Sequence, residues 1–231
     1  AQGLRNELGL PPDAVVVLSV AAIKRHHKRV DWLIEEFAQV RSANPKAYLV
    51  VAGGSEQETD EVVALGRQRL GDSVRFLVRF PRHRMADLYR AADVFVLASL
   101  WEMMPVALLE ALASGLPCLV HDTPLLRWQI GAGGEVIDMA EPGRLATTIA
   151  QYTYDEPRRR VTGAKARLHC QEQFGVDRVV ERIVEYYDFV ARHGRESRAC
   201  ANGKLAAPRE STVDCPVAPG AGAAASGLAS R

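Results

Sequence analysis

Two short polar segments carry the side chains that are best suited to chemistry. The first, residues 24–29, reads KRHHKR and holds four cations and two histidines. The second holds two glutamates, Glu102 and Glu110, which are separated by seven residues. Lysine and arginine make charge-assisted hydrogen bonds to phosphate oxygens, whereas a carboxylate accepts hydrogen bonds from hydroxyl groups such as those of sugars. The two segments together indicate a ligand with phosphate groups and hydroxylated rings.

Between the two glutamates lies a helix start suited to an anion. Its residues are Met103, Met104, Pro105 and Val106, and the apolar pattern predicts a helix over residues 106–113. Proline fits the first helical position, since its missing N–H costs nothing there. The first amides of a helix lack partners within the helix and, with the helix dipole, attract phosphate. A helix that begins near Pro105 places Glu110 about 7 to 8 Å along its axis.

Each of these features also has an ordinary structural interpretation. A basic run such as residues 24–29 is often a solvated turn, but cations at a helix N-terminus oppose the dipole unless an anion binds there. Glu110 alone would be a solvent-facing helix residue, and Gly53 either ends a strand or gives room to a ligand. No GxGxxG follows the first strand and no Walker A sequence occurs. Ordinary NAD binding and P-loop chemistry are therefore disfavoured.

Six apolar runs rich in valine and leucine alternate with amphipathic stretches along the chain. Such continuous apolarity is typical of strands covered on both faces. The runs occupy residues 15–21, 48–52, 74–78, 94–98, 118–120 and 135–137, and helical candidates occupy residues 30–41, 57–70, 85–91, 106–113 and 142–150. This alternation predicts an α/β fold with a doubly wound, six-stranded parallel sheet. The usual order 3-2-1-4-5-6 brings the two polar segments to one crevice, between strands one and four.

Composition sets the wider limits. Of 231 residues, 48% are hydrophobic and 25% charged, and the net charge of +1 gives no reason to expect nucleic acid as a partner. Four cysteines without metal-like spacing predict a reduced, cytoplasmic protein. The chain lacks both an initial methionine and a leader pattern, so we interpret it as a fragment. We expect a domain over residues 1–194 that closes with helices over 155–174 and 176–193, then a disordered Ala/Gly/Pro-rich tail over 195–231.

The stretch EMMPVALLEALASGLP resembles the E-x7-E motif of the retaining glycosyltransferases of family four. Other segments agree in order. HKRVDWLI, after the first strand, resembles the family's basic loop and helix start. The strand that ends in Ala52-Gly53-Gly54 resembles the family's A-G-x-G strand, and LYRAADV resembles its L-Y-x-x-A-D segment. The resemblance extends over residues 1–193. It implies that the chain is the Rossmann-like, donor-binding C-terminal half of a two-domain GT-B fold.

The resemblance also implies a role for each candidate residue. Lys28 and Glu102 would be the catalytic pair, with Lys28 on the donor diphosphate and Glu102 on the hydroxyls of the transferred sugar. Glu110 would bind the ribose, and the amides around Met103, Met104, Pro105 and Val106 would bind the phosphates. Arg79 and Phe80 would lie near the base, and Gly53 near the donor. No metal or other cofactor is expected. The acceptor would bind a missing N-terminal domain, through which any peripheral membrane association would occur.

Two departures from the family pattern keep other functions open. The family usually has an arginine a few residues before the loop lysine, whereas residues 21–23 read Ala-Ala-Ile, so Lys24 or Arg25 would have to supply that cation. Met103 stands where the family has a small glycine, and its side chain would crowd a close approach of the donor. The alternatives are a non-catalytic module that binds a sugar nucleotide or a partner, and a sugar-nucleotide epimerase of the same fold.

Overall fold

The computed structural model describes residues 2–201 of the chain. The chain forms two units, Ala1–Gly175 and Val176–Arg231. Most of the tail that we predict to be disordered, from residue 202 onward, lies outside the described residues. Within the described residues, no helix is both long and apolar enough to cross a membrane.

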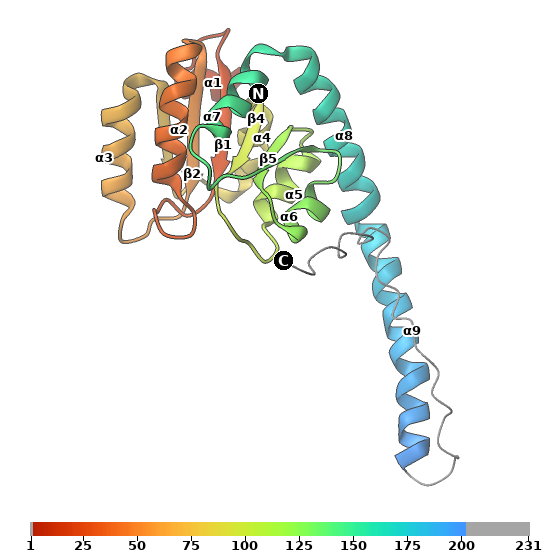
Figure 1. Cartoon of the computed structure of the whole chain (residues 1–231). Helices are drawn as coiled ribbons and strands as arrows, with labels where there is room; N and C mark the ends of the chain where they lie inside the picture. The colour runs from red at the N-terminus through yellow and green to blue at the C-terminus, as the bar shows by residue number, and fades with distance from the viewer. Residues whose placement is uncertain (1, 202–231) are drawn as a thin grey trace, which may run out of the picture. The chain divides into compact units, whose positions relative to one another are not determined.

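The first unit is built on a single parallel sheet (Figure 1). Its strands are β1 (Val15–Val20), β2 (Ala47–Gly53), β3 (Val74–Val78), β4 (Val94–Leu97), β5 (Cys118–His121) and β6 (Gly134–Ile137). They lie in the order β3-β2-β1-β4-β5-β6. The predicted fold class, strand number and strand order are confirmed. The reversal of strand order falls between β1 and β4, where Val17 pairs with Val94 and Leu18 with Phe95.

Helices cover both faces of this sheet. In chain order they are α1 (Gln2–Glu7), α2 (Val30–Ala43), α3 (Thr59–Leu70), α4 (Met85–Ala91), α5 (Val106–Ala113), α6 (Pro124–Ile130), α7 (Arg144–Tyr154) and α8 (Glu156–Phe174), with short 3-10 turns at Gly71–Ser73 and Arg82–Arg84. Two apolar cores result, because successive strand residues point to opposite faces. Val17 and Val51 pack with α2, α3 and α7, whereas Leu18 and Phe95 pack with α1, α4, α5 and α8.

One helix continues beyond the end that the sequence predicts. Helix α9 runs over Val176–Ala201 and passes through Gly194, where we expected it to stop. The helix end expected at Gly194 is therefore wrong, whereas the disordered tail stays a prediction. A glycine inside a helix costs about 1 kcal/mol relative to alanine, which a long helix tolerates.

The sequence pattern missed two short helices, α1 and α6. Helix α6 carries a recognisable start, since Thr123 accepts a hydrogen bond from the Leu126 amide and Pro124 follows directly. A threonine N-cap followed by proline is a standard start signal. Helix α6 contains only seven residues, and the apolar pattern alone did not show it.

Candidate functional site

The loops that follow β1 and β4 meet at the carboxyl edge of the sheet. The Lys28 ammonium lies 2.6 Å from Glu102 Oε1. The two side chains are 20% and 9% exposed, so the contact is shielded but still open to a ligand. Adjacent parallel strands end at one edge, and this brings together residues that are 74 positions apart. The predicted cation and carboxylate therefore contact each other at this edge of the sheet.

The backbone on either side of Lys28 is unusual. His27 and Arg29 have φ values of 68° and 51°, in the left-handed region that L-residues with side chains rarely adopt. Such residues cost about 1 to 3 kcal/mol each and persist where the surrounding contacts hold them. The side chains of His27 and Arg29 both make contacts that hold the backbone in this conformation.

His27 connects the loop after β1 to the loop after β4. Its ring stacks on Trp101 with 4.4 Å between centroids, and its Nε2 lies 2.9 Å from the Trp101 carbonyl oxygen. The same nitrogen lies 4.0 Å from Glu102 Oε2. Trp101 itself is 61% exposed.

Arg29 connects the loop after β1 to the segment after β6. Its guanidinium donates to the Met139 carbonyl at 2.9 Å and lies 4.5 Å from the centre of the Trp32 ring. Burial lowers the pKa of Arg29, although an arginine stays protonated in proteins. Lys28 thus extends from a loop that is anchored on both sides.

The start of α5 differs in detail from the expectation. Pro105 is the N-cap residue and Val106 the first helical residue, so the position expected for Pro105 is wrong by one residue. No side chain caps the helix, which leaves its first amides for a ligand. Met103, Met104 and Val106 are exposed, whereas Pro105 is buried. The buried Gln129 amide donates to the Pro105 carbonyl at 3.1 Å and holds this turn in place.

Glu110 lies on α5 and is half-buried. Its Oε2 accepts a hydrogen bond from the Tyr89 hydroxyl at 2.7 Å. Burial, and then this hydrogen bond, raise the pKa of Tyr89 far above the ordinary tyrosine value, so the hydroxyl stays protonated. Glu110 is therefore an oriented carboxylate rather than a freely rotating surface residue.

Lys24 and Arg25 are engaged by the region around α3. The Lys24 ammonium lies 3.8 Å from Glu56, and the Arg25 guanidinium 2.8 Å from Glu61. The Arg25 amide also donates to Glu58 at 3.0 Å. The structure does not bring these two cations to the Lys28–Glu102 contact, because carboxylates of the neighbouring segment bind them.

The remaining predicted residues lie at the ends of β2 and β3, on the same edge of the sheet. The Arg79 amide donates to the Gly53 carbonyl at 2.8 Å, and Arg79 has a left-handed φ of 57°. Arg79 is exposed and Phe80 half-buried. A Cβ on Gly53 would lie 1.7 Å from the Ala21 carbonyl oxygen, so close packing against the neighbouring chain already requires glycine there. Roles for these residues in donor binding stay predictions.

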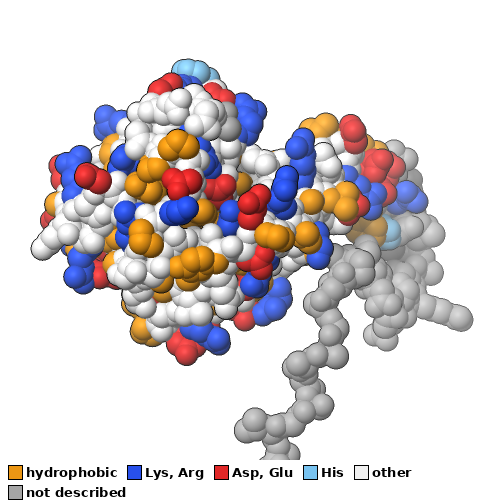
Figure 2. All heavy atoms as spheres, turned by 90° about the horizontal axis from the view of Figure 1, so that it is seen from above, with side chains coloured by type: hydrophobic (Ala, Val, Ile, Leu, Met, Phe, Trp, Pro, Cys, Tyr) orange, Lys and Arg blue, Asp and Glu red, His pale blue; other side chains and the backbone are white. Residues whose placement is uncertain are grey.

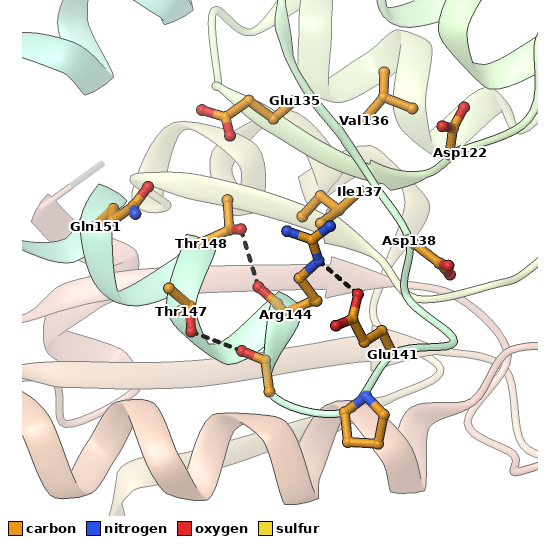
Figure 3. A pocket seen from close by; sticks show the side chains of 12 residues that line it. Asp122, Glu135, Val136, Ile137, Asp138, Glu141, Arg144, Thr147, Thr148 and Gln151 are labelled. Carbon is orange, nitrogen blue, oxygen red and sulfur yellow. Dashed lines mark hydrogen bonds and ion pairs between the residues drawn. The ribbon is translucent and has the colours of Figure 1, made fainter.

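A groove of about 750 Å³ lies between β6 and α7. The carboxylates of Asp122, Glu135, Asp138 and Glu141 line it, and Figure 3 shows Arg144 directed at Glu141. Of the others, Glu135 pairs with Arg158 and Asp122 with Arg127. These pairs already neutralise much of the negative charge, so the groove carries no functional assignment.

Charge over the surface is mixed. Figure 2 shows cationic and anionic side chains interspersed over the face that it views. Among the described residues, no three histidine, cysteine or acidic side chains form a metal-binding group. The expectations of no metal and no nucleic acid stay predictions.

Sequence reasoning missed four contributors to the site. They are His27 and Trp101, which join the two loops, and Tyr89 and Gln129, which hold Glu110 and the start of α5. His27 and Tyr89 stood inside recognised motifs, but their partners are distant in sequence and only the fold brings them near.

Comparison with known proteins agrees with this fold. Residues 2–169 match the sequence family described as Glycosyl transferases group 1. The chain belongs to this family, and its sheet is that of one half of a GT-B glycosyltransferase.

Individual relatives are similar over much of this chain. The D-inositol 3-phosphate glycosyltransferase of Thermomonospora curvata is 33% identical over 198 residues, which cover 81% of this chain and 46% of that protein. The alpha-monoglucosyldiacylglycerol synthase of Streptococcus pneumoniae is 33% identical over 123 residues, 53% of this chain and 28% of that protein. A sucrose-phosphate synthase structure from Thermosynechococcus elongatus has a TM-score of 0.73 and 25% identity, covering 84% of this chain and 49% of that one. This chain thus spans about half the length of such relatives.

Proposed function

We propose that the chain is the donor-binding half of a retaining glycosyltransferase that takes its sugar from a nucleoside diphosphate sugar. The observation that carries this proposal is the 2.6 Å contact between Lys28 and Glu102. It places a cation suited to a diphosphate and a carboxylate suited to sugar hydroxyls side by side, near the uncapped start of α5. Glu110, further along the same helix, would accept the ribose hydroxyls.

In the proposed reaction, the bond between the anomeric carbon and the diphosphate oxygen breaks, and its electron pair leaves with the nucleoside diphosphate. The acceptor hydroxyl attacks from the same face, and its proton passes to the departing diphosphate. The anomeric configuration is thereby retained. Lys28 and the first amides of α5 would stabilise the charge that develops on the diphosphate, while Glu102 positions the sugar. Because these groups supply the positive charge, we expect no metal ion.

The acceptor would bind an N-terminal domain outside this chain. This agrees with relatives about twice as long as the aligned region. We therefore expect the chain alone to bind nucleoside diphosphates but to turn over slowly or not at all. We infer a reducing cytoplasmic location, in keeping with Cys118 and Cys170, which are free thiols.

A second candidate function is a module that binds a sugar nucleotide without catalysis. One observation favours it: Lys24 and Arg25, which would replace the family's missing arginine, are held by Glu56 and Glu61. The exposed Met103 side chain adds bulk beside the donor site. In this alternative, Lys28 alone would bind the diphosphate too weakly to promote its departure.

The two functions are separated by joining the chain to its natural N-terminal half and assaying a panel of nucleoside diphosphate sugars. The proposal predicts release of the nucleoside diphosphate, and an anomeric product configuration, read by proton NMR, that equals that of the donor. Glu102→Gln should abolish turnover while the protein still folds. Binding without turnover in the joined protein would favour the module, and an inverted product would contradict the retaining mechanism.

A further inference from the structure

The Tyr89 hydroxyl makes the one side-chain hydrogen bond to the Glu110 carboxylate that the described residues show. Tyr89 lies on α4 and is 1% exposed, with its ring tilted against Phe95 of β4 at 6.2 Å between centroids. Its hydroxyl donates to Glu110 Oε2 at 2.7 Å. A tyrosine fixed in the core thus reaches the partly exposed carboxylate on the neighbouring helix.

This arrangement gives the two oxygens of the Glu110 carboxylate different partners. A carboxylate has two oxygens with about four acceptor positions, and Tyr89 occupies one side of Oε2. Glu110 Oε1 is left to accept a hydrogen bond from a ligand. The tyrosine ring is fixed by packing, so the carboxylate plane is set before any ligand arrives. Fixing an acceptor in advance lowers the entropy cost of binding.

The hydroxyl is also a permanent donor. Burial and the bond to Glu110 raise its pKa, so Tyr89 stays neutral throughout the physiological range. A neutral donor leaves the negative charge on Glu110. The carboxylate consequently keeps the acceptor character that recognition of a hydroxyl requires.

We propose that Tyr89 is a positioning residue, which orients Glu110 so that Oε1 accepts a ribose hydroxyl of the bound nucleotide. This inference rests on the proposed function, in which Glu110 binds the ribose. It adds a source of selectivity: the protein distinguishes a ribonucleotide from its deoxy form through a pair of residues, only one of which touches the ligand.

The test compares Tyr89→Phe with a matched control, Tyr152→Phe, in the full chain. Tyr152 lies on α7, is likewise 1% exposed, and has a pKa raised chiefly by burial. Both changes remove one hydroxyl and keep the ring, and thermal unfolding confirms that each variant folds. Calorimetry measures the affinity for UDP, GDP or ADP, whichever binds best, and for its 2′-deoxy and 3′-deoxy forms.

We expect the unmodified chain to prefer the ribose form over at least one deoxy form by about tenfold or more, the range for a hydrogen bond to a charged group. Tyr89→Phe should reduce this ratio to about twofold by weakening the ribose form, and Tyr152→Phe should preserve it. A ratio unchanged by Tyr89→Phe overturns the positioning role alone. A ratio near one in the unmodified chain overturns the ribose role of Glu110 and this inference with it. Failure of every diphosphate to bind overturns the proposed function itself.

Discussion

The Lys28 ammonium and the Glu102 carboxylate are each other's counter-ions, 2.6 Å apart at the carboxyl edge of the sheet. Glu102 is only 9% exposed, so the contact is largely shielded from solvent. A diphosphate that binds Lys28 would approach a cation already held beside Glu102. The same contact means that a single substitution of Lys28 also leaves a shielded carboxylate without its cation, which costs stability. A binding test on a Lys28 variant must therefore separate the loss of a phosphate contact from a general loss of protein stability.

The end of β2 offers a test of packing at the site edge. Gly53→Ala should lower the free energy of unfolding by more than about 3 kcal/mol, since large losses follow from severe overpacking. The added Cβ would lie 1.7 Å from the Ala21 carbonyl oxygen. Gly54→Ala is the control, because nothing lies within 4 Å of a Cβ there. Urea unfolding measures both, and equal stability of the two variants would refute this account of Gly53.

The left-handed backbone at His27 predicts an order of stability between two variants. His27→Ala and His27→Gly both remove the ring that stacks on Trp101, but only alanine keeps a Cβ at φ 68°. The glycine variant should therefore be more stable than the alanine variant by about 1 kcal/mol. Thermal unfolding of the pair provides the comparison. An alanine variant at least as stable as the glycine variant would show that this loop is not strained at His27.

The start of α7 depends on a carboxylate from α2. Glu36 is 3% exposed and accepts hydrogen bonds from the amides of Gly143 and Ala146 at 2.8 and 2.9 Å. Glu36→Ala should cost about 2 kcal/mol or more, because it leaves helix amides unpaired in the interior. Its neighbour Glu35 forms an exposed pair with Arg69, and Glu35→Ala should change stability little. Similar unfolding midpoints for the two variants would contradict the capping role.

Alkaline pH should destabilise the first unit through Cys118. This thiol is fully buried, and burial raises its pKa well above the ordinary value. The unfolded chain therefore loses the proton first, so the stability contribution is complete below about pH 8.5 and falls as pH rises beyond it. The difference in unfolding free energy between the unmodified chain and Cys118→Ala should decline by up to about 1.4 kcal/mol per pH unit. Urea titrations under reductant at pH 7.5, 8.5 and 9.5 measure it, and parallel pH curves would exclude the effect.

The sheet could be predicted from the sequence because the apolar runs that indicate its strands are local and repeated. Runs such as Val94–Leu97 are apolar throughout, and the alternation with helices leaves few topologies. The order of strands then placed the loops of Lys28 and Glu102 together. The ends of helices and strands were harder to predict from the sequence. Helix α9, for example, continues through Gly194.

The supporting contacts of the site could not be predicted in the same way. The bond from Tyr89 to Glu110 joins two helices, and the stacking of His27 on Trp101 joins two loops. Such pairs depend on side-chain directions that no spacing in the sequence encodes. Likewise, the KRHHKR run suggested one cationic cluster, whereas the fold separates Lys24 and Arg25 from Lys28 by pairing them with acidic residues near α3.

Calorimetry on Lys28→Ala with a nucleoside diphosphate and the matching nucleoside tests the central claim most directly. The nucleoside lacks the phosphates but shares the base and ribose, so it reports any general weakening of the fold or site. We expect the variant to bind the diphosphate at least about tenfold more weakly, as for a lost charge-assisted contact, and to bind the nucleoside as the unmodified chain does. Equal affinity of both proteins for the diphosphate would contradict the phosphate role of Lys28.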